Sequence, residues 1–150
     1  MKALKQNQLV LAEAKQWIGT PYQHQTSCKG IGTDCLGLIR GVWRSVLGAE
    51  PMEIPAYSQD WSEPAGLESL WNSAADVLTE KDPADAKAGD VLLFRMRQDA
   101  VAKHLGILGS DDPYQTFVHA YSGHGVVESP LSAPWARRIV AVFAFPERID

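Results

Sequence analysis

The sequence has few of the features that mark nucleic-acid-binding, membrane or disulfide-rich proteins. Its 150 residues include 14 Lys and Arg against 18 Asp and Glu, and the net charge is -4 at pH 7. The largest basic groups are the pairs Arg95/Arg97 and Arg137/Arg138. Nonspecific binding to nucleic acids depends on clustered Lys and Arg that neutralise phosphates. We therefore expect no nucleic-acid partner.

Long hydrophobic runs are missing as well. No segment reaches the length of a membrane span, and residues 1–8 lack the apolar core of a signal peptide. We therefore expect no membrane partner and synthesis as a cytoplasmic protein, which would need a phage particle or cell lysis to act outside the cell. Cysteine is also scarce. Without a secretory signal, its two copies, Cys28 and Cys35, are expected to be reduced.

What is present is the composition of one globular domain. Hydrophobic residues make up 45% of the chain and charged residues 21%, as in ordinary soluble proteins. A chain of this length removes about 68 to 70% of its unfolded surface from water, so it needs no disulfide. The sequence has no internal repeat and no low-complexity segment. We predict a single domain over residues 1–150.

The apolar pattern changes from helical to strand-like along the chain. Apolar spacing and breaker residues predict helices over residues 7–18, 33–48 and 65–79. A polar loop, residues 21–32, and a proline-rich surface loop, residues 50–64, separate them. Runs rich in Val, Ile and Phe then predict five strands: 91–94, 105–108, 115–120, 125–128 and 139–145. This order predicts an α+β domain, with N-terminal helices packed on a mostly antiparallel sheet of five to six strands.

The helix over residues 33–48 carries the first candidate for chemistry. Asp34 or Thr33 can cap its N-terminus, and Gly48 stands where a left-handed residue ends a helix. Cys35 therefore lies in the first turn, where the helix dipole and backbone N–H groups favour the thiolate. A lone cysteine on a helix is usually a small buried hydrophobe, so this position alone leaves both interpretations open.

Two histidines lie where they can serve such a thiol. A cysteine nucleophile needs a base, a group that orients the base, and donors for the oxyanion. His104 and His119 fall in consecutive predicted strands, and neighbouring antiparallel strands can present both imidazoles on one face while Val118 and Ala120 face the other way. The spacing permits this pairing, and the alternative for each histidine is a packed polar residue of the sheet.

Five short blocks stand in order along most of the chain: Gly19-Thr20-Pro21-Tyr22, Thr33-Asp34-Cys35-Leu36-Gly37-Leu38, Ala88-Gly89-Asp90-Val91-Leu92-Leu93-Phe94, Lys103-His104-Leu105-Gly106-Ile107 and Phe117-Val118-His119-Ala120. Together they resemble the ordered motifs of the NlpC/P60 cysteine peptidases. The likeness is greatest to the branch that prophages and gene transfer agents encode as a cell-wall peptidase, and the closing Trp135-Ala136-Arg137-Arg138 also resembles that branch.

The resemblance implies a papain-like NlpC/P60 fold and a role for each matching residue. Cys35 would be the nucleophile, His104 its base and His119 the orienting third member. Tyr22 would lie by the nucleophile and, with Asp34, help to bind substrate or the oxyanion. The chemistry of Asp34 itself favours a cap and loop anchor over a proton carrier, because a carboxylate beside the thiolate would oppose its charge. The implied reaction is hydrolysis of peptidoglycan stem peptides, between γ-D-glutamate and the diamino acid. It needs no cofactor and no metal, and phage tail proteins are the implied partners.

The sequence departs from the commoner family pattern at two places. Leu36 follows the nucleophile where most members have Ser, and residues 23–26 replace a pair of glycines. Both positions are implied to touch substrate, so the peptide recognised is less defined than the triad. His24 and His124 match no block, and we assign them no catalytic role.

Three alternatives stay open at the level of sequence. A zinc-binding module would use Cys28, Cys35 and some of the four histidines, although six residues between the cysteines fit a structural zinc site poorly. A phage-tail protein could keep the fold without the activity, against which the intact Cys35, His104 and His119 argue. A thiol acyltransferase would use the same triad.

Overall fold

The chain has the α+β architecture that the sequence predicts. A computed structural model describes residues 2–51 and 68–147. The helices are α1 (Lys2–Gln16), α2 (Cys35–Val46), α3 (Ser69–Val77) and the short α4 (Ala133–Ala136), with a 3-10 turn, η2, at Pro83–Asp85. No helix within the described ranges is long and apolar enough to cross a membrane.

Six strands form one antiparallel sheet in the order β3-β8-β4-β5-β6-β7. They are β3 (Thr79–Lys81), β4 (Val91–Arg95), β5 (Ala102–Leu108), β6 (Thr116–Tyr121), β7 (Gly125–Pro130) and β8 (Ile139–Ala144). A separate hairpin joins β1 (Ser27–Cys28) to β2 (Gly32–Thr33). All five predicted strands are therefore confirmed.

Three sequence predictions need correction or lie outside the described chain. The predicted helix over residues 65–79 ends at Val77, and Thr79–Lys81 form the edge strand β3 instead. This polar segment has no strand-like apolar alternation, and it becomes a strand by pairing with residues 142–144 of β8. The predicted loop over residues 21–32 contains β1 and the start of β2. The predicted proline-rich loop lies almost wholly outside the described residues.

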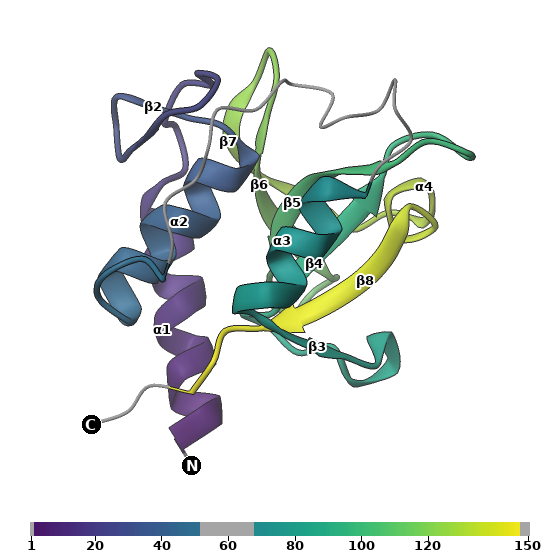
Figure 1. Ribbon diagram of the computed structural model, residues 1–150, viewed down its shortest axis with the longest axis horizontal. Helices are drawn as coiled ribbons and strands as arrows, with labels where there is room; N and C mark the ends of the chain where they lie inside the picture. The colour runs from purple at the N-terminus through teal and green to yellow at the C-terminus, as the bar shows by residue number, and fades with distance from the viewer. Residues whose placement is uncertain (1, 52–67, 148–150) are drawn as a thin grey trace.

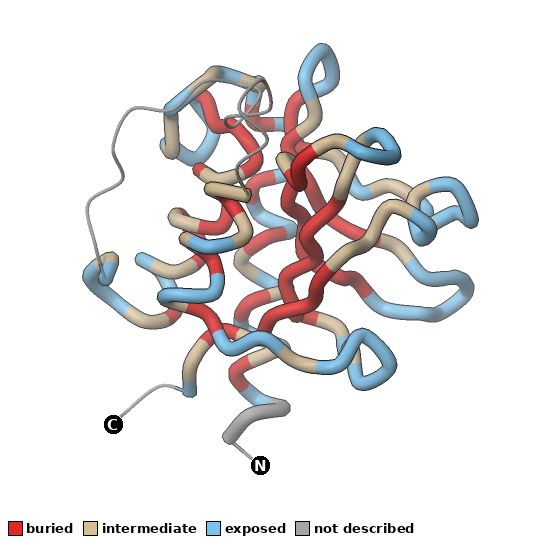
Figure 2. The backbone as a smooth tube through the Cα atoms, turned by 45° about the vertical axis from the view of Figure 1, so that its right-hand side comes forward, coloured by how far each residue is buried: buried red, intermediate tan, exposed pale blue. Residues whose placement is uncertain are grey.

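The sheet buries apolar side chains on both faces. Figure 1 shows α1 and α2 side by side beside the sheet, and α3 packed across it. Val118 and Ala120 of β6 belong to the main core, which includes residues of α1, α2 and α3, while Phe117 belongs to a second cluster that includes Trp135. Buried residues accordingly concentrate in the central strands, and exposed residues in the turns (Figure 2).

Close packing fixes α2 against its neighbours. Leu38 and Val42 are fully buried, and each such burial contributes about 1.5 to 3 kcal/mol. The helix approaches α1 at Gly41, where a Cβ atom would collide with the ring of Trp17. It ends at Val46, followed by Gly48 with a φ of +98°, as the sequence predicts. The N-terminus of α2 is therefore held at one place relative to the sheet.

Candidate active site

Asp34 fixes the N-terminus of α2 and thereby the position of Cys35. One oxygen of its carboxylate accepts a hydrogen bond from the Gly37 N–H at 2.7 Å, and the other accepts from the Gln25 N–H at 2.7 Å. The first bond is the predicted helix cap. The second joins the cap to the preceding loop, so the carboxylate holds both segments around the first turn of the helix.

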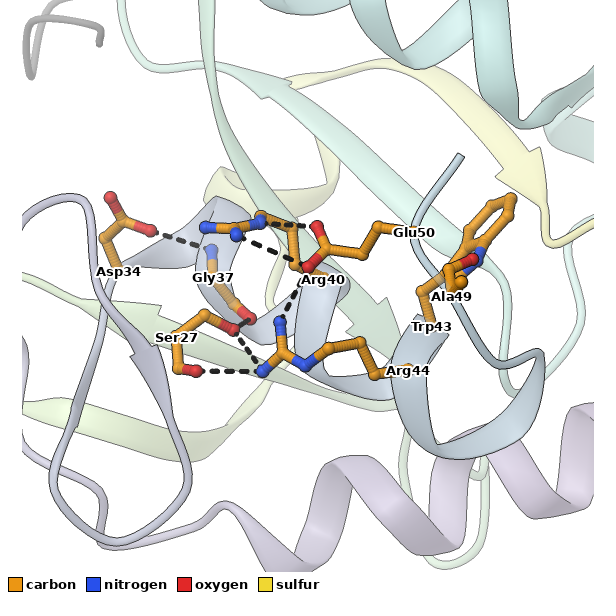
Figure 3. A network of polar contacts seen from close by, with 8 residues as sticks. All are labelled: Ser27, Asp34, Gly37, Arg40, Trp43, Arg44, Ala49 and Glu50. Atoms are coloured by element: carbon orange, nitrogen blue, oxygen red, sulfur yellow. Dashed lines mark hydrogen bonds and ion pairs between the residues drawn. The ribbon is translucent and has the colours of Figure 1, made fainter. Parts of the chain in front are cut away.

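A network of polar contacts anchors α2 further along its length (Figure 3). Ser27 of β1 donates to the Gly37 carbonyl at 2.6 Å, and Arg44 donates to the Ser27 carbonyl at 2.8 Å. Glu50 then accepts from Arg40 at 2.7 Å and from Arg44 at 3.0 Å. The β1–β2 hairpin, α2 and the chain after it are thus tied together, which limits movement of the helix that carries the thiol.

Strands β5 and β6 pair over only two positions, Ile107 with Val118 and Leu108 with Phe117. The preceding residues of β5 therefore lack β6 as a ladder partner. The Cys35 thiol bonds to main-chain groups of this stretch: it donates to the Lys103 carbonyl at 3.9 Å and accepts from the Leu105 N–H. The sulfur is thereby held against the main chain on both sides of His104.

His104 and His119 meet directly. His104 Nε2 lies 2.7 Å from His119 Nδ1, and the two rings are nearly perpendicular, at 80°. This confirms the prediction that neighbouring strands present both imidazoles on one face. His119 Nε2 lies 2.9 Å from Ser129 Oγ on β7, which extends the chain of polar groups by one residue.

Aromatic rings enclose the two imidazoles. The Trp135 ring of α4 lies 5.7 Å from that of His104 and 5.2 Å from that of His119, measured between centroids. Tyr121 lies 5.9 Å from His104 and 5.4 Å from His119. Arg138 packs over the outer side of the cluster, with its guanidinium carbon 5.4 Å from the Trp135 ring centre. These rings screen the bond between the histidines from water.

Burial keeps the thiol and both imidazoles neutral in the free protein. Desolvation lowers the pKa of His104 to about 3, with a further contribution from His119, and desolvation lowers the pKa of His119 to about 4, with a contribution from His124. Desolvation and then the charge of Asp34 raise the pKa of Cys35 to about 12. The backbone donors at the helix N-terminus lower the pKa of Cys35, as the sequence predicts, but burial and the charge of Asp34 outweigh them in the free protein.

Tyr22 packs against the core cluster that includes Cys35. Its main chain forms a bridge with Thr33, directly before the helix cap. Burial, with smaller contributions from Cys35 and Asp34, raises the pKa of its phenol to about 12. The phenol is therefore a neutral hydrogen-bond donor at neutral pH. His24 is also close, with Nδ1 at 3.8 Å from Asp34 Oδ2.

Sequence reasoning missed two residues of this site. Nothing in the sequence marked Ser129, whose role depends on strand register: it lies opposite Phe117 in the β6–β7 ladder, two residues from His119. Trp135 belonged to the closing motif, but no role had been assigned to it. His124, which also received none, is exposed and stacks on Tyr121 at an interplanar angle of 8°.

The cysteines and histidines do not assemble the ligand set of a zinc module. Cys28 is exposed on β1, Cys35 is buried at the start of α2, and both are free. In the described parts of the chain, no three His, Cys, Asp or Glu side chains converge as metal ligands. Cys35 instead bonds to the main chain beside His104. His104 bonds to His119, which also bonds to Ser129.

Three solved structures illustrate the fold that the chain shares with known proteins. The NlpC/p60 domain of the peptidoglycan hydrolase SagA is 23% identical, with a TM-score of 0.63 over 93% of this chain and 98% of that domain. The P60 domain of antigen MAP1204 from M. avium subspecies paratuberculosis is 17% identical, with a TM-score of 0.60 over 99% of this chain and all of that one. A protein similar to a lipoprotein, of the NLP/P60 family, from Staphylococcus aureus subsp. aureus Mu50 is 21% identical, with a TM-score of 0.61.

The match to the Staphylococcus protein covers 97% of this chain but 42% of that protein. A search of curated proteins found no match. The sequence profile of the NlpC/P60 family, however, matches residues 19–144. This range contains α2 with Cys35 and the strands that carry both histidines. The chain therefore belongs to the NlpC/P60 family.

Proposed function

We propose that the protein is a cysteine peptidase that hydrolyses an amide bond in peptidoglycan stem peptides. The observation that carries the proposal is the joint placement of Cys35, His104 and His119: the sulfur lies against the main chain on both sides of His104, whose ring bonds to His119 at 2.7 Å. Family membership supports the substrate class, because SagA, whose NlpC/p60 domain shares the fold, is a peptidoglycan hydrolase.

Acylation begins from a neutral thiol and a neutral imidazole. Nε2 of His104 is bonded to His119, which leaves Nδ1 to accept the proton of the Cys35 thiol. The sulfur then forms a bond to the carbonyl carbon of the scissile amide, and the carbonyl oxygen takes the negative charge. When the C–N bond breaks, His104 returns the proton to the leaving amine. Cys35 is left as a thioester of the acid portion.

Deacylation reverses the proton movements with water in place of the amine. A water molecule gives a proton to His104 and forms a bond to the thioester carbon. The C–S bond then breaks and releases the acid, and His104 returns the proton to the sulfur, which restores the thiol. The oxyanion formed in each step needs hydrogen-bond donors. We assign this role to the Cys35 N–H at the start of α2 and to the neutral phenol of Tyr22.

The bond between γ-D-glutamate and the diamino acid is the one that we propose, on the strength of the sequence likeness. Two positions implied to touch substrate, Leu36 and residues 23–26, differ from the commoner pattern. We also propose that the protein is associated with a phage particle, reaches the cell wall in that way or through lysis, and is synthesised in the cytoplasm. The sequence likeness to the prophage branch supports this part.

The test is to incubate the protein with purified peptidoglycan and with isolated stem peptides and to identify products by mass spectrometry. We expect a peptide fragment whose mass identifies the bond. The Cys35→Ala variant should give no product. Cys28→Ala is the matched control, because it removes the exposed thiol on β1 and leaves the buried Cys35 in place, and it should retain full activity.

Two outcomes would contradict the proposal. Hydrolysis by the Cys35→Ala variant would rule out the thiol mechanism. The absence of any product from folded, reduced protein would rule out the peptidase and favour a structural protein of the same fold. Addition of an acceptor amine distinguishes an acyltransferase, since a transferred product would replace the hydrolysed one.

A further inference from the structure

Ser129 continues the line of polar groups that runs from the thiol through both histidines. It lies on β7, and its hydroxyl oxygen is 2.9 Å from His119 Nε2. The opposite nitrogen of the His119 ring, Nδ1, is 2.7 Å from His104 Nε2. Both nitrogens of His119 are therefore committed to hydrogen bonds, one on each side. In a neutral imidazole one nitrogen donates and the other accepts, so each bond determines the direction of the other.

Two arrangements of protons satisfy these distances, and only one can accept the thiol proton. If Ser129 accepts from His119 Nε2–H, then His119 Nδ1 accepts from His104 Nε2–H, and His104 Nδ1 is left bare as the base. If Ser129 instead donates to His119, every bond reverses and His104 carries its proton on Nδ1. That tautomer cannot act as a base at Nδ1, and a wrong tautomer is known to disable a catalytic histidine while its geometry stays intact.

The surroundings favour the first arrangement. The reversed arrangement would put a proton on His104 Nδ1, which makes no hydrogen bond to any residue that the structure describes, whereas Nε2 has His119 as its partner. In the first arrangement, each N–H of the pair donates to nitrogen or oxygen at 2.7 to 2.9 Å. Ser129 is also partly exposed, so water can accept its hydroxyl proton.

We propose that Ser129 is a positioning residue which, by accepting from His119, holds both histidines in the Nε2–H tautomer and keeps His104 Nδ1 available as the base. Its hydroxyl acts through His119 and His104 and does not touch the substrate. The catalytic part of this inference rests on the proposed peptidase function. The tautomer part does not, because it concerns the free protein alone.

Nitrogen-15 labelling of the histidine rings tests the tautomer directly. Two-bond proton–nitrogen correlation spectra at pH 7 distinguish a protonated ring nitrogen from a bare one, and the His24→Gln and His124→Gln variants identify the remaining two rings. We expect His104 and His119 to carry their protons on Nε2. In Ser129→Ala we expect a mixture of tautomers, whereas Ser129→Thr, which keeps the hydroxyl, should preserve the original pattern.

The matching kinetic test compares the same variants on stem peptides. Loss of one hydrogen bond of this kind predicts a fall in kcat of about five- to tenfold in Ser129→Ala with KM little changed, and near-complete retention in Ser129→Thr. Ser122→Ala, an exposed serine in the β6–β7 turn, is the matched control. Thermal unfolding of each variant confirms that it is folded.

The outcomes separate this proposal from the proposed function. An Nδ1 proton on His119 in the unmodified protein, or an unchanged tautomer in folded Ser129→Ala, would overturn the role of Ser129 even if the enzyme is active. A tautomer that depends on Ser129 in a protein that cleaves no stem peptide would support the positioning role and overturn the peptidase. A kcat that is as low in Ser129→Thr as in Ser129→Ala would contradict the role of the hydroxyl.

Discussion

Alkylation of Cys35 reports whether its thiol is neutral or ionised before substrate binds. The thiolate is the reactive species, and burial together with Asp34 raises the pKa of Cys35 from an ordinary value of 9.0 to about 12. Three pKa units lower the thiolate population at neutral pH by about a thousandfold. We therefore expect Cys35 to react with iodoacetamide about a thousandfold more slowly than a free cysteine in a short peptide.

The assay uses the Cys28→Ala variant, in which Cys35 is the one remaining cysteine. Alkylation is followed by mass spectrometry from pH 5 to pH 10, with a cysteine peptide in the same tube as the reference. We expect the rate at Cys35 to rise about tenfold per pH unit across this range, because the thiolate population does so below its pKa. Circular dichroism at each pH shows that the fold is retained.

A second variant separates the two causes of the raised pKa. Asp34→Asn keeps an oxygen for the cap at Gly37 but removes the negative charge, so the pKa of Cys35 should fall and alkylation should become faster. A rate that stays level across neutral pH, at or above that of the peptide, would show a thiolate already paired with an imidazolium. That result would refute the neutral-pair argument and restore the thiolate predicted from the helix N-terminus.

Three further predictions concern stability, each measured by denaturant unfolding. Burial lowers the pKa of His104 to about 3 and of His119 to about 4, so the unfolded chain takes up protons first as pH falls below 6.5. The free energy of unfolding should therefore decrease by up to about 1.4 kcal/mol per pH unit for each histidine, and a flat profile between pH 6.5 and pH 4 would contradict their burial as neutral rings. Gly41→Ala should lower the free energy of unfolding by about 1 to 3 kcal/mol, because its Cβ collides with Trp17; no loss would show that the two helices can move apart freely. Asp34→Ala should lower the free energy of unfolding by about 2 kcal/mol, because it removes the bonds to the Gly37 and Gln25 N–H groups. Asp34→Asn keeps the cap oxygen and should lower it less, so equal losses in the two variants would contradict the cap.

The features that the sequence predicted correctly depend on local patterns. Helix α2 begins after the capping Asp34 and ends before Gly48, because the cap and the left-handed residue act within one turn of the helix. The five strands β4 to β8 follow from runs of β-branched and aromatic residues. The pairing of His104 with His119 was predictable as well, since side-chain alternation puts both on one face once the strands are known to be neighbours.

The features that the sequence did not predict depend on tertiary contacts. Residues 79–81 are polar and become a strand only through β8. Ser129 reaches His119 because of the β6–β7 register, which no local pattern specifies. The protonation of Cys35 has the same explanation: the sequence shows the backbone donors that lower its pKa, but not the depth of burial that raises it.

The neutral state of both groups determines where charge develops during the proposed reaction. Because the pKa of Cys35 lies far above that of His104, proton transfer before bond formation would create two buried charges at a large cost. Transfer that accompanies attack avoids a free thiolate, since the negative charge passes from sulfur to the substrate oxygen as the S–C bond forms. The charges to be stabilised are then an oxyanion near the Cys35 N–H and Tyr22 and an imidazolium on His104. The bond to His119 and the ring of Trp135 lie where they can stabilise that imidazolium, so the enclosure that suppresses charge in the free protein is also arranged to favour charge in the transition state.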